Sequence, residues 1–291
     1  MPPPNPQEVA VKRPQMKNGL KKIWMWYRHI PTALTLCNSL CGFAAILNTL
    51  RVYEPNANIP EVLAGSAWLI VGAMIFDMLD GWVARLLNAF SDHGMNMDSL
   101  ADMVTFGVAP AVMIAVLAQT AELLLPYRLV WVLCAIYLGC AAIRLALYNV
   151  KALNKESTEG FDGLPSPGAA AALVTLIILF ADAQSETYIT LVQWLPIYAG
   201  VIGLLMVSSI PFLHFGRWLG SKRYNKAKVL ALIVFFLFFS WNSRLVAAVA
   251  ANLYVLSGPI AVGIRWIIAR VRRERPAAIA ETPAEAAVGG K

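Results

Sequence analysis

Four aspartates between positions 77 and 102 are the residues of this chain best suited to chemistry. Helical spacing puts one group of residues on a single helix face: Asp77, Asp80, Gly81, Ala84 and Arg85, at i, i+3, i+4, i+7 and i+8. A second group repeats every four residues and shares one face of a following helix: Gly94, Asp98 and Asp102. The spacing predicts a helical hairpin whose facing surfaces carry four carboxylates, one guanidinium and three very small residues.

Apolar segments flank this hairpin on both sides. Clustered carboxylates repel each other, and near the depth of a lipid bilayer they do not ionise cheaply without a counter-charge. Hard divalent cations with oxygen ligands, Mg²⁺ or Mn²⁺, are the natural counter-charge. The small residues leave room for a bulky ligand to approach the helix backbones. The hairpin is therefore predicted to be an active site.

The composition places the hairpin in a membrane protein. Of the 291 residues, 58% are hydrophobic and only 14% are charged, whereas about 25% are charged in an average soluble domain. The formal net charge of +7 would also suit a nucleic-acid-binding protein. The basic clusters, however, adjoin apolar spans, as expected of positive-inside loops. We therefore expect no nucleic-acid partner.

The predicted fold is all-α and polytopic, with about eight transmembrane helices. Each apolar span has close to the roughly 20 residues that a bilayer requires. The predicted spans are 33–50, 62–80, 99–119, 128–149, 168–183, 188–210, 227–243 and 246–268. The fifth and seventh are the weakest, so six or seven spans are an alternative.

Three regions follow from this division. Residues 1–30 comprise a disordered, Pro-rich N-terminus and an interfacial amphipathic helix at 18–29, for which a plain juxtamembrane linker is the alternative. Residues 31–270 form one transmembrane domain, and 271–291 a disordered tail. Lys and Arg concentrate on alternate connections, which places both termini and the aspartate hairpin in the cytoplasm. We expect an integral protein of a bacterial inner membrane, with its active site facing the cytoplasm.

The hairpin matches the pattern D-x-x-D-G-x-x-A-R-x(8)-G-x-x-x-D-x-x-x-D at every fixed position. It thereby resembles the signature of the CDP-alcohol phosphatidyltransferases, and the resemblance extends over about residues 31–172. It implies that Asp77, Asp80 and Asp98 hold divalent metals, while Asp102 completes the set and acts as general base on the incoming alcohol. The implied CDP pocket is lined by Gly81, Ala84, Arg85 and Gly94, with Arg85 on the diphosphate. The resemblance also implies a homodimer.

The first span contains two further candidates, Thr35 and Asn38, which share a helix face and resemble the same part of the family. They are candidates for contacting the nucleotide or for supporting the aspartates. An ordinary interhelical hydrogen bond is an equal alternative.

A second resemblance concerns the acceptor. Phe161–Pro167, which leads into Ala169–Ala172, resembles the segment that marks phosphatidylserine synthases within the family. The alternative is an ordinary loop before a helix that starts with proline. The resemblance implies transfer of a phosphatidyl group from CDP-diacylglycerol to L-serine, giving phosphatidylserine and CMP.

Three residues at the end of the preceding span are candidates for binding the acceptor or a phosphate: Arg144, Tyr148 and Asn149. Arg144 would bind an anion, either a lipid phosphate or the carboxylate of the acceptor. The alternative for Arg144 is a cation that snorkels to the membrane surface.

Three other kinds of function are alternatives. The same chemistry could serve glycerol phosphate, inositol phosphate or choline, although a phosphorylated acceptor would call for more cations than Arg85 and Arg144 supply. A cation transporter would need acidic residues at mid-membrane depth in several helices. Here they concentrate in one hairpin. A purely structural membrane scaffold is the third alternative.

Overall fold

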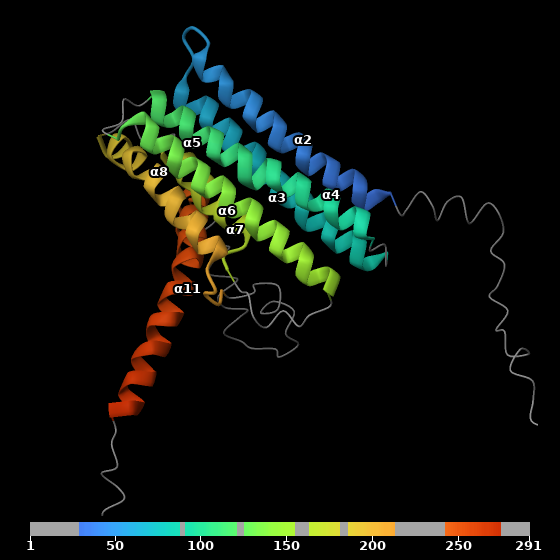
Figure 1. Cartoon of the computed structure of the whole chain (residues 1–291). Helices are drawn as coiled ribbons and strands as arrows, with labels where there is room; N and C mark the ends of the chain where they lie inside the picture. Colours follow the sequence, from blue (N-terminus) through green and yellow to red (C-terminus); the bar gives the residue numbers. More distant parts are fainter. Residues whose placement is uncertain are drawn as a thin grey trace, which may run out of the picture.

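The computed structural model describes residues 29–87, 91–120, 125–154, 163–180, 186–212 and 242–274, and all regular secondary structure within them is helical. The elements are α2 (Ile30–Leu50), η1 (Arg51–Tyr53), α3 (Ile59–Leu86), α4 (Asp92–Asp102), η2 (Met103–Val108), α5 (Ala109–Thr120), α6 (Tyr127–Asn154), α7 (Ser166–Phe180), α8 (Glu186–Val207) and α11 (Ser243–Glu274). Figure 1 shows helices α2 to α8 side by side in one bundle, from which the long α11 extends.

The chain is an integral membrane protein. Five helical stretches in the described part of the chain are long and apolar enough to cross a bilayer: Ile30–Tyr53, Ile59–Leu86, Asp92–Thr120, Tyr127–Lys151 and Ser243–Arg270. Two further apolar helices are shorter, Ser166–Leu179 and Gln193–Val207, and these coincide with the fifth and sixth predicted spans. The predicted count of eight is not confirmed.

Several predictions fall on residues outside the described ranges. The seventh predicted span is outside them up to residue 241, as are the N-terminal region to residue 28 and the chain beyond residue 274. At the other end of the predicted domain, α11 continues to Glu274. It therefore runs four residues into the segment predicted as a disordered tail.

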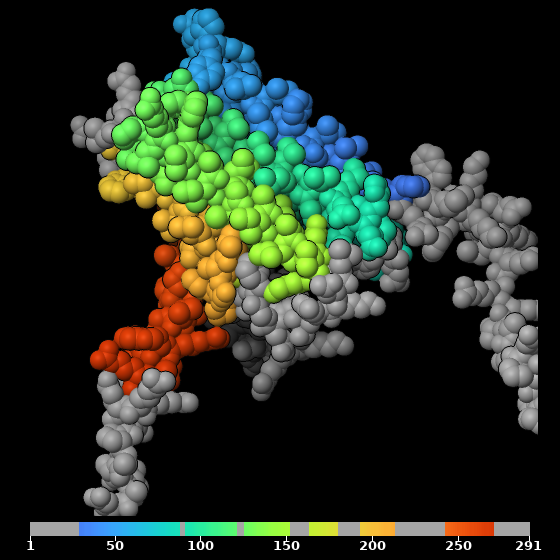
Figure 2. All heavy atoms as spheres, viewed as in Figure 1, coloured from blue at the N-terminus to red at the C-terminus, as the bar shows by residue number. Residues whose placement is uncertain are grey.

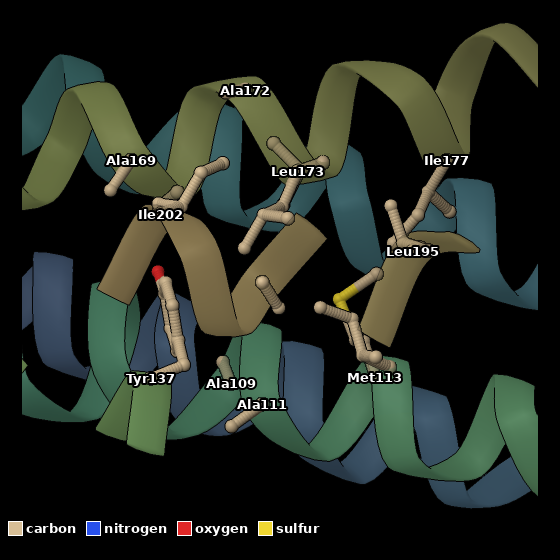
Figure 3. Close-up of a cluster of buried hydrophobic side chains, with 14 of the residues drawn as sticks. Ala109, Ala111, Met113, Tyr137, Ala169, Ala172, Leu173, Ile177, Leu195 and Ile202 are labelled. Atoms are coloured by element: carbon tan, nitrogen blue, oxygen red, sulfur yellow. The ribbon is translucent and has the colours of Figure 1, made fainter. Parts of the chain in front are cut away.

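Small residues allow the helices to approach closely, as is typical of packing in membranes. Figure 3 shows the alanines Ala109, Ala111, Ala169 and Ala172 among larger side chains from α5, α6, α7 and α8. On α8, a Cβ added to Gly203 would lie 2.8 Å from the Cα of Tyr137. The α6–α8 contact therefore depends on the absence of a side chain at this position.

The helix that carries the second half of the aspartate motif changes its winding directly after Asp102. Residues Met103–Val108 form a π-helical segment, and the backbone N–H of Ala109 donates to the carbonyl of Val104. Pro110 has no N–H, so it cannot make the α-helical bond to the carbonyl of Phe106. The hydroxyl of Tyr137 donates to that carbonyl instead, at 2.6 Å. Such π segments are frequent at functional sites.

Replacing Tyr137 with phenylalanine should destabilise the bundle. The side chain is fully buried, so the variant leaves the Phe106 carbonyl unsatisfied at a cost of about 1–3 kcal/mol. Thermal unfolding in detergent should show a lower Tm for Tyr137→Phe than for the control Tyr53→Phe, whose hydroxyl bonds to Gln119 at the exposed surface. Equal Tm values for the two variants would contradict this account of the π segment.

Candidate active site

The predicted hairpin consists of the end of α3 and the whole of α4. Asp77 and Asp80 lie in the last three turns of α3, while Asp98 and Asp102 lie in α4. Ser91 begins α4, because its side chain accepts a hydrogen bond of 3.0 Å from the backbone N–H of Gly94. Because α4, η2 and α5 follow one another without a break, these aspartates stand on one long helical element.

Three carboxylates converge at this hairpin. Asp77, Asp98 and Asp102 each offer an oxygen atom, and these atoms all lie within 4.8 Å of one another. Asp77 and Asp102 are within hydrogen-bonding reach of each other, which two carboxyl groups tolerate only if they share a proton or a cation. One carboxylate oxygen of Asp98 is buried and has no hydrogen-bond partner.

No lysine or arginine in the described part of the chain forms a salt bridge with this cluster. Between residues that the structure describes, the only salt bridge joins Arg51 to Glu54, which lie at the α2–α3 turn and thus at the other end of the bundle (Figure 1). Carboxylate oxygens are the ligands that Mg²⁺ and Mn²⁺ prefer. The orphaned Asp98 oxygen and the close Asp77–Asp102 pair therefore fit a divalent metal.

Helix α2 supports the aspartates from the side. Thr35 donates to Asp80 at 2.8 Å, and Asn38 donates to Asp102 at 3.1 Å. Asn38 is itself fully buried. Both bonds are interhelical, and each reaches an aspartate side chain of the predicted site. Asp80 lies outside the group of three converging carboxylates.

The approach of α2 depends on one glycine. A Cβ added to Gly42 would collide with the side chain of Thr105 in the π segment. At this close distance the Thr105 hydroxyl donates to the backbone carbonyl of Asn38 at 3.0 Å. Gly42 and Thr105 thus fix the position of Asn38 along the bundle axis relative to Asp102.

The face of α3 beside the cluster is open. Arg85 is exposed, and its Nε donates to the carbonyl of Gly81 at 2.9 Å. A Cβ on Gly81 would have Arg85 Nη2 as its nearest neighbour, at 4.0 Å. Ala84 is half-buried on the same helix. Gly94 has less space, because a Cβ there would lie 3.1 Å from the hydroxyl of Ser91.

The candidates on α6 differ in their surroundings. Arg144 donates to the hydroxyl of Ser166, the first residue of α7, at 3.3 Å, and it lies within electrostatic range of Asp102. Asn149 accepts a hydrogen bond of 3.0 Å from Ser99, which ties α6 to α4. Tyr148 is 59% exposed.

Sequence reasoning did not single out Ser99 as a partner of Asn149. The available signal was its place directly after Asp98 in the motif helix. This signal is weak, because serine is common at solvated helix positions.

Comparison with known proteins identifies the family. A family model described as CDP-alcohol phosphatidyltransferase matches residues 28–205. The chain belongs to this family. The matched region contains the aspartate hairpin, Arg144 and Ser166, whereas α11 lies beyond it. The family consists of metal-dependent phosphotransferases, and the buried aspartate cluster is present in this member.

Curated relatives share one name, CDP-diacylglycerol–serine O-phosphatidyltransferase. The Mycobacterium bovis protein is 35% identical over 188 residues, covering 62% of this chain and 60% of the relative. The Bacillus subtilis protein is 35% identical over 204 residues, which cover 65% of this chain and 98% of the relative. The Helicobacter pylori protein is 33% identical over 216 residues, which cover 71% of this chain and 81% of the relative. The match thus spans about 60% of the length of the mycobacterial relative.

A side chain at Gly81 should block a ligand without disturbing the fold, because the space above it is open. Gly81→Leu should lower the affinity for a CDP-lipid at least about tenfold while leaving the Tm unchanged. Gly72→Leu is the control, since a Cβ on Gly72, earlier on α3, meets nothing within 4 Å. The measurement is binding of the CDP-lipid to purified protein in detergent. Unchanged affinity in Gly81→Leu would show that this face of α3 does not contact the nucleotide.

Proposed function

We propose that this protein transfers a phosphatidyl group from CDP-diacylglycerol to L-serine, forming phosphatidylserine and CMP. The observation that carries the proposal is the convergence of Asp77, Asp98 and Asp102 within 4.8 Å beside an open helix face. Full-length coverage of the Bacillus subtilis relative, which is named for this reaction, supports the choice of substrates.

The three converging aspartates would hold a divalent metal, Mg²⁺ or Mn²⁺, and Asp80 would contribute from its place against Thr35. A bound cation supplies neutralisation of the diphosphate charge, which makes CMP a better leaving group. Arg85 stands at the open face above Gly81 with a guanidinium suited to a phosphate oxygen. Gly81, Ala84 and Gly94 would form the floor of the CDP pocket.

Asp102 is the proposed general base. Asp102 is 8% exposed as a residue, and its carboxylate is oriented by a hydrogen bond from Asn38 of α2, so it can accept a proton without free rotation. The serine hydroxyl oxygen attacks the phosphorus that carries the diacylglycerol, and its proton passes to Asp102. The bond from this phosphorus to the CMP oxygen breaks, and CMP leaves with the electron pair.

Arg144 is the proposed partner of the serine carboxylate. It lies on the side of Asp102 where α6 meets the start of α7, and a guanidinium binds a carboxylate in a bidentate manner. Asn149 would stabilise this arrangement through its bond to Ser99, with Tyr148 at the rim.

The orientation follows from charge. We propose that the aspartate hairpin faces the cytoplasm of a bacterium, since Lys and Arg concentrate on the connections at its end of the bundle. The homodimer is a proposal that rests on the family alone.

Metal should bind at the three-aspartate cluster. Asp98→Asn should weaken binding of Mn²⁺ at least about tenfold, because it removes a charged ligand whose oxygen is otherwise unpaired. Asp92→Asn is the control, since Asp92 is exposed in the first turn of the same helix. Titration calorimetry measures the Mn²⁺ affinity of both variants. In the intact protein, chelation of the metal should abolish CMP release. Equal Mn²⁺ affinity in the two variants would remove Asp98 from the metal site.

The acceptor is tested by CMP release from CDP-diacylglycerol with a panel of alcohols. Serine should give faster release than glycerol phosphate, inositol phosphate or choline. Asp102→Asn should retain binding of the CDP-lipid but lower kcat by at least about 100-fold, because a general base acts only at the chemical step. A faster reaction with another acceptor would refute the serine assignment. A parallel loss of CDP-lipid binding would make Asp102 chiefly a ligand.

A further inference from the structure

The surroundings of Arg144 include a helix that the family model does not cover. Arg144 reaches the hydroxyl of Ser166 with one terminal nitrogen, whereas its buried Nε has no hydrogen-bond partner. A buried N–H of a charged group without a partner is costly. Its presence points to an acceptor atom that belongs to a ligand.

Tyr254 of α11 lies beside the same place. Its ring packs on the first turn of α7, where a Cβ added to Gly168 would lie 2.9 Å from the Tyr254 Cε1. The position is also supported by Phe212, whose ring centroid is 6.0 Å from that of Tyr254. Gly168 is two residues beyond Ser166, the partner of Arg144. The ring is therefore held over the start of α7.

The hydroxyl of Tyr254 completes the arrangement. It is within electrostatic range of the Arg144 guanidinium, and the hydroxyl makes no hydrogen bond to another residue in the described part of the chain. The cationic Arg144 from α6 and the phenol of Tyr254 from α11 thus both lie at the start of α7. A carboxylate is the ligand that satisfies both, because each of its oxygens accepts hydrogen bonds.

We propose that Tyr254 is a specificity-determining residue, which binds the carboxylate of the amino-acid acceptor together with Arg144. This inference rests on the proposed function and deepens it. It makes α11 part of the acceptor site, although α11 lies outside the residues 28–205 that define the family match. Acceptors without a carboxylate would leave both donors unpaired, and they would be disfavoured for that reason.

The test compares Tyr254→Phe with the intact protein by steady-state kinetics of CMP release. The variant keeps the ring that packs on Gly168 and Phe212 and removes only the hydroxyl. We expect the KM for serine to rise about tenfold, as for one hydrogen bond to a charged group, with kcat and the KM for CDP-diacylglycerol changed less than about twofold. Ethanolamine, the acceptor without the carboxylate, should react equally slowly with both proteins.

Tyr198→Phe is the matched control, because it also removes a hydroxyl that contacts α11. That hydroxyl donates to Asn252 at 2.5 Å, only two residues before Tyr254. A loosened α11 would raise the KM for serine in both variants, whereas a direct contact raises it only in Tyr254→Phe. Gly168→Ala, which must displace the ring, should also raise the KM for serine.

The possible outcomes distinguish a failure of the role proposed for Tyr254 from a failure of the proposed function. An unchanged KM for serine in Tyr254→Phe, in a protein that does use serine, overturns the role of Tyr254 alone. A rise in the KM for CDP-diacylglycerol in place of serine also overturns it, because Tyr254 would then contact the lipid phosphate. Failure of the intact protein to use serine refutes the proposed function itself.

Discussion

Close packing of carboxylates inside an apolar helix bundle is the constraint on which this structure depends. Oxygen atoms of Asp77, Asp98 and Asp102 lie within 4.8 Å of one another, at positions that are buried or half-buried, and no arginine or lysine of the described chain forms a salt bridge with them. Burying such groups as anions costs several kcal/mol each. A divalent cation removes the penalty. The carboxylate cluster, which would destabilise the metal-free protein, therefore creates affinity for a metal.

The rest of the bundle holds these carboxylates at fixed positions. Asn38 and Thr35 restrain Asp102 and Asp80 from α2, and the close approach at Gly42 makes those bonds possible. The π segment after Asp102 widens the helix at the point where α2 packs. Its freed carbonyl is satisfied by Tyr137 from the opposite side. Because lipid supplies no hydrogen bonds, each departure from α-helical pairing needs such a partner.

Apolar packing and the contacts of the candidate site involve different groups of side chains. Helices α5 to α8 pack through alanine, leucine and isoleucine (Figure 3), whereas the hydrogen bonds around the site join α2 to α3 and α4, α4 to α6, and α6 to α7. In the space-filling view of Figure 2, α11 extends away from the bundle. Its earlier turns lie against α7, which brings Tyr254 to Gly168 and to the region of Arg144. A helix distant in sequence can therefore contribute to recognition of the acceptor.

The sequence by itself determined the class of protein, the family and the two helices of the hairpin. Helical periodicity, the scarcity of charge and a motif with eight fixed positions are all properties of the linear sequence, which do not depend on how the helices pack. The tertiary structure alone decided that three of the four aspartates converge, that Thr35 and Asn38 bond to aspartates, and that Ser99 binds Asn149. It also decided that Tyr254 lies over the start of α7. The longest of these contacts joins Gly168 to Tyr254, about 86 positions apart, and no periodicity within one helix encodes which side chain of another helix it will meet.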